Sequence, residues 1–539
     1  MIRSGHVDTF TRDALPPAAL MPRLEPVGLR LDYPERLNCV SWLLDYWIEH
    51  GAGDRPAFYS PSETWTYREL FERVNRIADV LVRGLGLKPG NRVLLRAPNT
   101  PMLAACYLAV MKAGGVTVAT MPMLRARELA APIAKAKIAL ALCDHRLTAD
   151  LEEAKAIEPT LQRIVTFGSP DAEMERAMAS ASPVFTAADT ANDDVCLIGF
   201  TSGTTGGPKG TMHYHRDVLA IADTYGRHVL KATAGDRFIG SPPLAFTFGL
   251  GGLVIFPMAA GASTVLLERA TPDDLLPAIA RFGPSVLFTA PTAYRAMIAK
   301  LGEHDISSLR CCVSAGEALP KATFTAWKEA TGLDLMDGIG ATEMLHIFIA
   351  SPQGEIRAGA TGRAVPGYEA RVVDADMNDV PRGTAGSLAV RGPTGCRYLA
   401  DERQAKYVRD GWNLTGDTYI QDADGYFWYQ ARSDDMIVTA GYNVSGPEVE
   451  QVLAGHAAVA ECAVIGTPDE ERGMVITAFV VPAAGRTGSP DLAKELQDHV
   501  KQSIAPYKYP RRVEFVAQLP KTPTGKLQRA ALRAQFAKG

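Results

Sequence analysis

A glycine-rich stretch near the middle of the chain has the composition of a loop that holds polyphosphate. It follows an apolar run at Val195–Phe200 and contains Thr201, Ser202, Gly203, Thr204, Thr205 and Lys209. Glycines leave backbone N–H groups free to point inward, hydroxyls add donors, and the lysine adds positive charge. It is not a Walker A loop, because Gly210 follows the lysine where that motif has serine or threonine. We predict a phosphate-binding loop of another type; a polar surface loop is the alternative.

The elements around this loop alternate between strand and helix patterns. Apolar runs of strand length occur at Val195–Phe200 and Val286–Thr289. The segment Tyr67–Leu85 has helical periodicity, with these residues on one face: Leu70, Val74, Ile77 and Leu81. Such alternation predicts an α/β fold with largely parallel sheets, in which ligands bind beyond the carboxyl ends of the strands.

A second, smaller unit is predicted after residue 433. The short charged segment 432–435 separates two apolar patterns. The residues beyond it indicate, in order, strands at Ala460–Ile465 and Val475–Val481, a helix opened by Ser489 and Pro490, and a strand at Arg512–Val516. We expect a large body over residues 1–433 and a small α+β domain over residues 434–539.

Composition and charge exclude several classes of protein. The 539 residues include 56 Lys+Arg and 60 Asp+Glu, a net charge of −4, so the chain lacks the basic excess of a nucleic-acid binder. The eight cysteines show no C-x-x-C pair and no zinc-like spacing with histidine. We interpret His213 and His215 as part of a helix start and not as metal ligands. With no secretory signal recognised near the start, a reducing, cytoplasmic location is expected.

One uncharged run, Ile239–Leu267, is longer than the roughly 20 residues that span a bilayer. It contains Pro242, Pro243 and Pro257 together with several glycines, which interrupt a continuous helix. We therefore expect a loop and a short buried helix, with no insertion into a membrane.

The ordered set of motifs resembles the adenylate-forming superfamily, which includes acyl- and aryl-CoA synthetases, peptide-synthetase adenylation domains and luciferases. The matching segments are Trp65–Leu70, the glycine-rich loop, Pro243–Gly249, Ser314–Glu317, Asp337–Glu343, Thr415–Asp417, Arg432–Asp435 and Leu519–Lys526. They cover nearly the whole chain. Each segment alone is weakly specific, whereas the set in this order is highly specific. The resemblance implies a body of packed α/β subdomains followed by a mobile C-terminal domain.

The resemblance also implies a nucleotide site. The loop Thr201–Lys209 would hold the β- and γ-phosphates of ATP, where departing pyrophosphate concentrates negative charge. Thr342 would contact the phosphates and Glu343 the Mg²⁺ ion, since a hard cation prefers carboxylate oxygen. Asp417 would accept hydrogen bonds from the ribose hydroxyls, and Arg432 would approach the ribose or a phosphate. The adenine would lie against Ala315, Gly316, Glu317, Asp337 and Gly338.

Three residues near the C-terminus have implied roles in two successive half-reactions. Lys526 would be catalytic, because an ammonium between an attacking carboxylate and the α-phosphate relieves their repulsion and orients both. Asp434 would be the hinge about which the small domain rotates. Gly441 would line the passage for the thiol of coenzyme A, so no catalytic cysteine is needed. The plainer alternatives are a tail lysine and a solvated linker.

The acyl pocket implied by the resemblance is aromatic and short. Its residues would be Phe246, Thr247, Phe248, Ala315, Gly338, Ile339, Leu345 and His346. Aromatic walls suit a flat aryl carboxylate. The run Gly338–Phe348 is similar to benzoate-CoA ligases, and Leu31–Cys39 is similar to 2-aminobenzoate-CoA ligases. His346 would face an ortho substituent of the ring or support the pocket from behind.

The resemblance implies an ATP- and Mg²⁺-dependent enzyme that makes an aryl-adenylate and then its coenzyme A thioester, with benzoate or 2-aminobenzoate as the acid. The alternatives are an aryl-acid adenylating enzyme that loads a carrier protein, and a catalytically silent nucleotide-binding regulator. Ala431 and Val438 depart from the glycine and lysine common in relatives, which affects expectations for the hinge and for coenzyme A contacts. A homodimer is compatible with this assignment.

Overall fold

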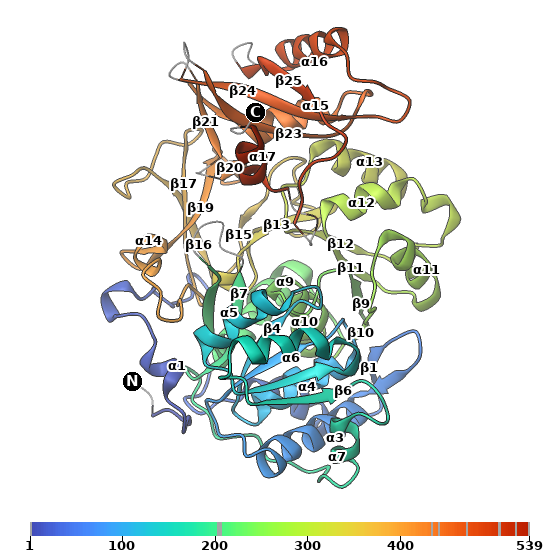
Figure 1. Ribbon diagram of the computed structural model, residues 1–539, viewed down its shortest axis with the longest axis vertical. Coiled ribbons are helices and arrows are strands. Elements are labelled where there is room, and N and C mark those ends of the chain that lie inside the picture. Colours follow the sequence, from blue (N-terminus) through green and yellow to red (C-terminus); the bar gives the residue numbers. More distant parts are fainter. Residues whose placement is uncertain are drawn as a thin grey trace.

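The computed structural model describes residues 3–201, 207–432, 435–439, 442–469, 473–504, 508–522, 525 and 527–536. Figure 1 shows a large body built on several sheets, with the elements after residue 435 gathered at one end, near α12 and α13. Strands and helices alternate through the first 350 residues, as the sequence pattern predicted.

One sheet of the body has six strands and carries the glycine-rich stretch at its edge. Its strands, in order, are β6 (Arg163–Phe167), β5 (Leu140–Asp144), β3 (Arg92–Arg96), β4 (Val116–Thr120), β7 (Val195–Thr201) and β8 (Lys209–Tyr214). All neighbours are parallel except β7 and β8, which are antiparallel with Thr201 opposite Lys209. The glycine-rich stretch thus connects β7 to the edge strand β8, whereas a Walker A loop would lead into a helix.

The second sheet has nine strands. In order they are β15 (Arg363–Ala364), β14 (Ile347–Ala350), β13 (Leu335–Gly340), β12 (Cys311–Ser314), β11 (Val286–Thr289), β9 (Arg237–Gly240), β10 (Ser263–Val265), β1 (Pro56–Tyr59) and β2 (Thr64–Thr66). The run from β13 to β1 is parallel. Alternate residues of these strands enter different cores: Cys312 and Leu287 pack on one face, Cys311 and Phe288 on the other. Both cysteines are core residues.

Helices cover both sheets in layers. The helices α5 (Ala126–Ala136) and α6 (Thr148–Ile157) share a core with one face of the six-stranded sheet, and α11 (Pro272–Phe282), α12 (Pro291–Ile298) and α13 (Lys321–Thr331) share one with an outer face of the nine-stranded sheet. The helices α3 (Tyr67–Asp79) and α4 (Pro101–Lys112) pack in the core that both sheets share; every residue of α4 is buried, whereas α3 buries only one face. A capping box starts α3: Thr66 Oγ1 accepts from the Glu69 N–H and Glu69 accepts from the Thr66 N–H.

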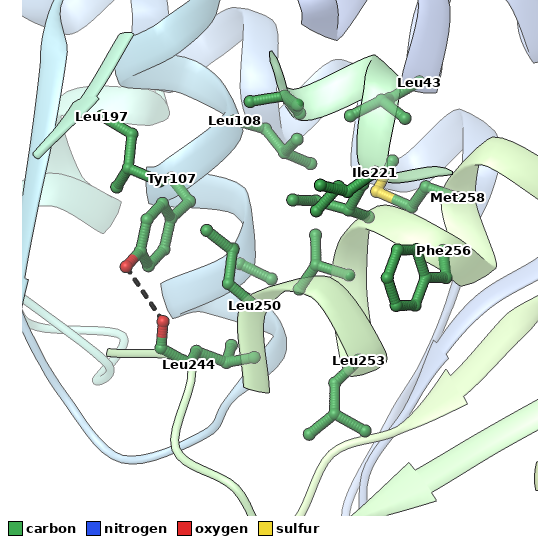
Figure 2. Packing of buried hydrophobic residues seen from close by; sticks show 14 of the residues in the cluster. Leu43, Tyr107, Leu108, Leu197, Ile221, Leu244, Leu250, Leu253, Phe256 and Met258 are labelled. Atoms are coloured by element: carbon green, nitrogen blue, oxygen red, sulfur yellow. Dashed lines mark hydrogen bonds between the residues drawn. The ribbon is translucent and has the colours of Figure 1, made fainter. Parts of the chain in front are cut away.

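The uncharged run 239–267 lies in this middle layer. It forms α9 (Thr247–Leu250), a π-helical turn (Gly251–Ile255) and α10 (Phe256–Ala260) between β9 and β10. The expected loop and buried helix are thus a loop and three consecutive helical pieces. Figure 2 shows Leu250, Phe256 and Met258 among apolar side chains of other segments, with the Tyr107 hydroxyl donating to the Leu244 carbonyl at 2.9 Å. Among the described residues, no helix combines the length and apolar character required to cross a membrane.

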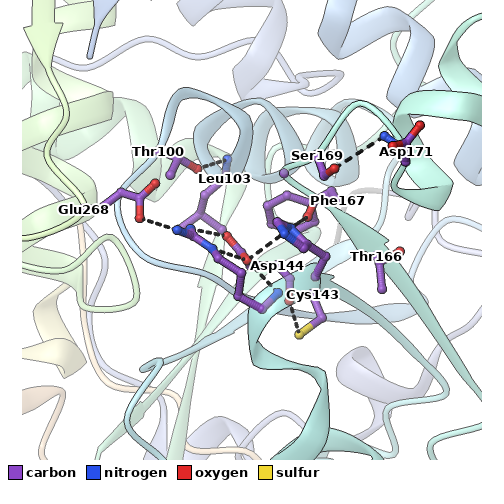
Figure 3. A network of polar contacts seen from close by, with 12 residues as sticks. Thr100, Leu103, Cys143, Asp144, Thr166, Phe167, Ser169, Asp171 and Glu268 are labelled. Carbon is purple, nitrogen blue, oxygen red and sulfur yellow. Dashed lines mark hydrogen bonds and ion pairs between the residues drawn. The ribbon is translucent and has the colours of Figure 1, made fainter. Parts of the chain in front are cut away.

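An ion-pair network joins the two sheets. Asp144, at the carboxyl end of β5, accepts from the side chain of Arg146, whose other nitrogen lies 2.8 Å from Glu268 beyond β10. Figure 3 shows this network. Polar contacts therefore bridge the two sheets in addition to the core that they share.

A third sheet completes the body. Its strands are β16 (Glu369–Val373), β17 (Ala385–Arg391), β18 (Val408–Arg409), β19 (Trp412–Gln421) and β20 (Phe427–Arg432), with the short helix α14 (Gln404–Tyr407) before β18. The remaining short helices are α1 (Phe10–Asp13), α2 (Tyr46–Glu49), α7 (Glu173–Met178) and α8 (His215–Ile221).

The C-terminal elements have a core of their own. They are the hairpin β21 (Met436–Thr439) and β22 (Tyr442–Ser445), the sheet β23 (Val459–Asp469), β24 (Gly473–Pro482) and β25 (Arg512–Phe515), and the helices α15 (Gly446–Ala454), α16 (Pro490–Ser503) and α17 (Arg529–Phe536). Ser489 Oγ accepts from the Leu492 N–H and Pro490 opens α16, as the sequence predicted. The apolar face of α16 is buried in this core.

Candidate active site

Thr342 and Glu343 lie in a tight turn between β13 and β14, beside the edge of the six-stranded sheet. Gly199 of β7 permits this approach, because a Cβ at that position would lie 2.7 Å from the Thr342 methyl carbon. The Nε2–H of His213 on β8 donates to the Thr342 carbonyl at 2.8 Å. The turn is therefore attached to the two strands that flank the glycine-rich stretch.

Glu343 is held by a tyrosine from a distant segment. The Tyr398 hydroxyl donates to Glu343 Oε1 at 2.5 Å, and the Lys209 ammonium lies 5.3 Å from the centre of the same tyrosine ring. Tyr398 is buried, whereas Glu343 is half-buried. One side chain thus contacts both the lysine that ends the glycine-rich stretch and the carboxylate predicted to bind metal.

A buried ion pair lies behind this arrangement. Arg397 bonds to Asp217, and both side chains have no exposed surface. Burial alone would raise the pKa of Asp217, but the Arg397 guanidinium, together with His213 and Arg216, outweighs burial and lowers that pKa below its ordinary value. His213 Nδ1 lies 3.7 Å from the same carboxylate. Burial lowers the pKa of His213, so its imidazole is neutral and donates through Nε2 to the turn.

The residues assigned to the adenine lie just beyond the carboxyl end of β12 and in the middle of the adjacent strand β13. Ser314 pairs with Asp337 in the parallel register, and the buried Ala315 and exposed Gly316 follow directly. Glu317 is half-buried and Gly338 is buried. Loss of water around its carboxyl group raises the pKa of Asp337 to about 8. The carboxyl end of β12 is thus the kind of place where an α/β sheet binds its ligands.

The residues assigned to the ribose lie on adjacent strands of the third sheet. Asp417 of β19 pairs with Arg432 of β20, and Arg432 Nη1 lies 3.5 Å from Asp417 Oδ1. The Asp417 N–H donates to Thr415 Oγ1 at 3.2 Å, and Gly416 between them has a φ of +77°. This turn fixes the carboxylate close to a cation.

His346 lies inside an aromatic enclosure. Its ring centroid is 4.5 Å from that of Phe256, 5.4 Å from Tyr225, 5.7 Å from Phe248 and 6.3 Å from Phe288. Within the described part of the chain, neither imidazole nitrogen has a hydrogen bond of normal geometry, and neither does the buried Tyr225 hydroxyl. Burial lowers the pKa of His346 to about 3, against a smaller opposing effect of the Phe248 backbone. The imidazole is therefore neutral, with unused hydrogen-bonding capacity.

Other residues predicted for the pocket lie on the same elements. Phe246, Thr247 and Ile339 are half-buried, and Ala315, Gly338 and Leu345 are buried. Leu345 has a φ of +67°, a strained conformation for a branched side chain, in the turn that connects Glu343 to His346. The aromatic neighbours Tyr225, Phe256 and Phe288 were not predicted, because nothing in their local sequence separates them from ordinary core residues.

Several predicted site residues lie outside the described residues: Ser202, Gly203, Thr204, Thr205, Asp434, Gly441 and Lys526. Their roles remain predictions. Nearby, Asp435 is bonded to Arg533 and lies 3.8 Å from Arg529 of α17, so the residue after the predicted hinge contacts the helix that follows Lys526.

The fold also gathers Cys39, Cys196 and His215, whose potential ligand atoms lie within 4.8 Å of one another. Sequence spacing gave no sign of this cluster. His215 starts α8, as predicted, whereas His213 lies on β8 and is not part of the helix start. The Nδ1 of His215 accepts a hydrogen bond from the Cys39 backbone N–H at 3.2 Å. That nitrogen already has a partner within the protein.

Comparison with known proteins identifies the family of the chain. Residues 45–398 match the AMP-binding enzyme family, and residues 448–526 match the AMP-binding enzyme C-terminal domain. The chain is 37% identical over 511 residues to a benzoate–CoA ligase of Thauera aromatica, covering 93% of this chain and 96% of that protein. A 4-hydroxybenzoate–CoA/benzoate–CoA ligase of Rhodopseudomonas palustris is 34% identical, with 92% and 94% covered.

A solved structure of an anthranilate CoA ligase in complex with anthranoyl-AMP superimposes with a TM-score of 0.89 at 37% identity, covering 94% of this chain and 99% of that one. These matches confirm the resemblance and the α/β fold with a smaller C-terminal domain. The chain belongs to the AMP-binding enzyme family, within the adenylate-forming superfamily.

Proposed function

We propose that this chain is an ATP-dependent ligase that joins an aryl carboxylic acid to coenzyme A, with benzoate or 2-aminobenzoate as the acid. The observation that carries the proposal is the aromatic enclosure around His346, three residues beyond Glu343. Planar rings pack well against aromatic walls, and a neutral imidazole can donate to or accept from a ring substituent. The benzoate- and anthranilate-ligase names of the relatives agree with this chemistry.

In the first half-reaction, a carboxylate oxygen of the acid attacks the α-phosphorus of ATP. An acyl–phosphate bond forms, the bond between the α-phosphorus and the bridging oxygen breaks, and pyrophosphate leaves. Both reactants are anionic, so we assign Lys526 to the space between them. The glycine-rich stretch and Lys209 would hold the departing pyrophosphate.

Thr342 and Glu343 suit a Mg²⁺ ion in their chemistry, because a hydroxyl and a carboxylate supply hard oxygen ligands. When bound, the ion would neutralise phosphate charge. The protein's own part is to orient these oxygens, through the Tyr398 hydrogen bond to Glu343 and the His213 hydrogen bond to the Thr342 carbonyl.

In the second half-reaction, the thiol of coenzyme A attacks the acyl carbonyl, the thioester forms, and AMP leaves with the acyl–phosphate electron pair. We propose that residues 434–539 rotate as a unit about Asp434 between the steps, and that Gly441 lines the path of the thiol. Asp417 and Arg432 would bind the ribose side, and Ala315, Gly316, Glu317, Asp337 and Gly338 the adenine.

The test is a panel of acids assayed with ATP, Mg²⁺ and coenzyme A, containing benzoate, 2-aminobenzoate, hydroxybenzoates and fatty acids. We expect aryl-CoA formation with at least one aryl acid and a change in the ratio of 2-aminobenzoate to benzoate turnover in His346→Leu. Preference for a long-chain acid would refute the pocket assignment. Formation of an aryl-adenylate without thioester formation would indicate a carrier-loading enzyme instead.

A further inference from the structure

We propose that Tyr398 is a positioning residue that keeps the Glu343 carboxylate apart from the Lys209 ammonium, so that both stay available to ATP and its metal ion. This rests on the proposed function, because it assigns Glu343 to the metal and Lys209 to the phosphates. Tyr398 itself touches no reacting atom in this assignment.

Two opposite charges beside one tyrosine would ordinarily bond to each other. The Tyr398 hydroxyl donates to Glu343 Oε1 at 2.5 Å, and Lys209 Nζ lies 5.3 Å from the ring centre of the same residue. In the part of the chain that the structure describes, the lysine and the glutamate form no ion pair. A direct pair would occupy the carboxylate and neutralise the lysine, so the site would have to break it before binding ATP.

Tyr398 satisfies both charged groups without joining them. Its hydroxyl gives the carboxylate a charge-assisted hydrogen bond, and its ring face attracts the ammonium through a cation–π interaction. The hydrogen bond uses Oε1, and Oε2 has no protein partner among the described residues. One carboxylate oxygen therefore stays open for a ligand.

The tyrosine is rigid enough for this role. Its backbone N–H donates to Gln404 Oε1 at 2.9 Å, and the residue forms an isolated β-bridge with Thr211 of β8. Its ring packs edge-on against Tyr407 at 5.7 Å. A fixed backbone and a packed ring lose little further entropy when the hydroxyl holds the carboxylate.

The segment is also anchored from behind by its neighbour in sequence. Arg397 bonds to Asp217, and its Nε donates to the Met212 carbonyl at 3.1 Å. The Met212 N–H in turn donates to the Arg397 carbonyl at 2.8 Å. Tyr398 is thereby tied to β8, the strand that begins with Lys209.

The test compares Tyr398→Phe, which removes the hydroxyl and keeps the ring, with Tyr407→Phe, which removes a buried hydroxyl from the adjacent ring. We measure binding of Mn²⁺ in the presence of ATP, without acid, by electron paramagnetic resonance, and the Mg²⁺ dependence of acid-dependent ATP–pyrophosphate exchange. Tyr398→Phe should weaken Mn²⁺ binding about ten-fold or more, as expected for losing a hydrogen bond to a charged group. Tyr407→Phe should bind Mn²⁺ like the wild type, and the KM for the acid should be unchanged in both.

A double-variant cycle with Glu343→Gln separates positioning from a general loss of structure. If Tyr398 acts through the carboxylate, Tyr398→Phe should have little further effect on Mn²⁺ binding in the Glu343→Gln background. Wild-type Mn²⁺ binding by Tyr398→Phe, an equal loss in Tyr407→Phe, or additive effects in the cycle would overturn the proposal. The binding assay contains no aryl acid, so its result does not depend on which acid is the substrate. Unchanged Mn²⁺ binding by the single variant Glu343→Gln would refute the assignment of Glu343 to the metal, which belongs to the proposed function.

Discussion

Replacing Asp217 by asparagine would remove the charge that compensates Arg397 in the core. Both side chains have no exposed surface, so water cannot solvate the guanidinium left behind. The asparagine oxygen would still accept from the Tyr214 N–H, which lies 3.0 Å from the carboxylate, so the start of α8 should remain capped. The variant therefore tests the charge and leaves the local hydrogen bond in place.

Removing one partner of a buried ion pair costs about 3–5 kcal/mol. An unfolding entropy of about 2.1 cal/mol/K per residue, over a body of about 430 residues, gives roughly 0.9 kcal/mol/K. We therefore expect Asp217→Asn to lower the melting temperature by about 3–6 °C. Folding lowers the pKa of Asp217 from its ordinary value of 3.8. The ionised carboxylate therefore stabilises the fold fully above pH 3.8, and this stabilisation is lost as the pH falls through the lower pKa of the folded state. The difference between variant and wild type should hold at neutral pH and shrink only in acid.

Differential scanning calorimetry at neutral pH measures the shift. The control is Asp273→Asn, which breaks a pair with Lys300 whose side chains are 66% and 46% exposed, and which should change the melting temperature by about 1 °C or less. The double variant Asp217→Leu with Arg397→Met should recover most of the loss, because apolar residues of similar size can replace a buried pair. A shift below 1 °C in Asp217→Asn, or a double variant as unstable as the sum of its parts, would refute the reasoning.

The remaining predictions concern catalysis and acid stability. Lys526→Ala should reduce acid-dependent ATP–pyrophosphate exchange by about 10²-fold or more, the scale for losing one oriented donor, and near-wild-type exchange would contradict the catalytic role of Lys526. Asp434→Pro should spare that exchange and impair thioester formation, and equal losses of both steps would contradict the hinge role of Asp434. Burial would raise the pKa of Asp236, but hydrogen bonds from Arg310, from the Ser285 hydroxyl and from the Thr233 N–H together lower it from 3.8 to about 2. The ionised carboxylate therefore adds about 2 kcal/mol to the free energy of unfolding at neutral pH, and this contribution is lost as the pH falls from about 4 to about 2. Asp236→Asn should be less stable than the wild type at pH 7 by about this amount in urea unfolding, and a gap that stays constant down to pH 2 would argue against the linkage.

Local patterns predicted the elements that depend on local interactions. The apolar face of α3, the strands β7 and β11 and the capped start of α16 follow from periodicity and capping within a few residues. The order of the strands depends on contacts far apart in the chain: β1 at Pro56–Tyr59 pairs with β10 at Ser263–Val265. No periodicity specifies that neighbour, so sequence indicated the fold class and only the family resemblance implied the arrangement.

The residues of the candidate site also divide into those that local sequence predicts and those that only distant contacts reveal. Glu343, Asp417 and Lys209 lie in glycine-rich motifs that are recognisable in sequence. Asp217 and Arg397, 180 residues apart, look like ordinary solvated charges until the fold places them together. The sequence therefore predicted candidate groups for the chemistry, while the groups that hold these candidates in position emerged only from the tertiary contacts.

Arg397 and Tyr398 connect these two sets of residues. Adjacent residues of an extended segment point to opposite sides, so one can enter the core while the next faces the site. Arg397 bonds to the buried Asp217, and Tyr398 bonds to Glu343. A pair of apolar residues could fill the space of the ion pair at similar stability, but it would lose the directional bonds from Arg397 to Asp217 and to the Met212 carbonyl. Those bonds fix the segment along β8, and the position of Glu343 relative to Lys209 depends on that register.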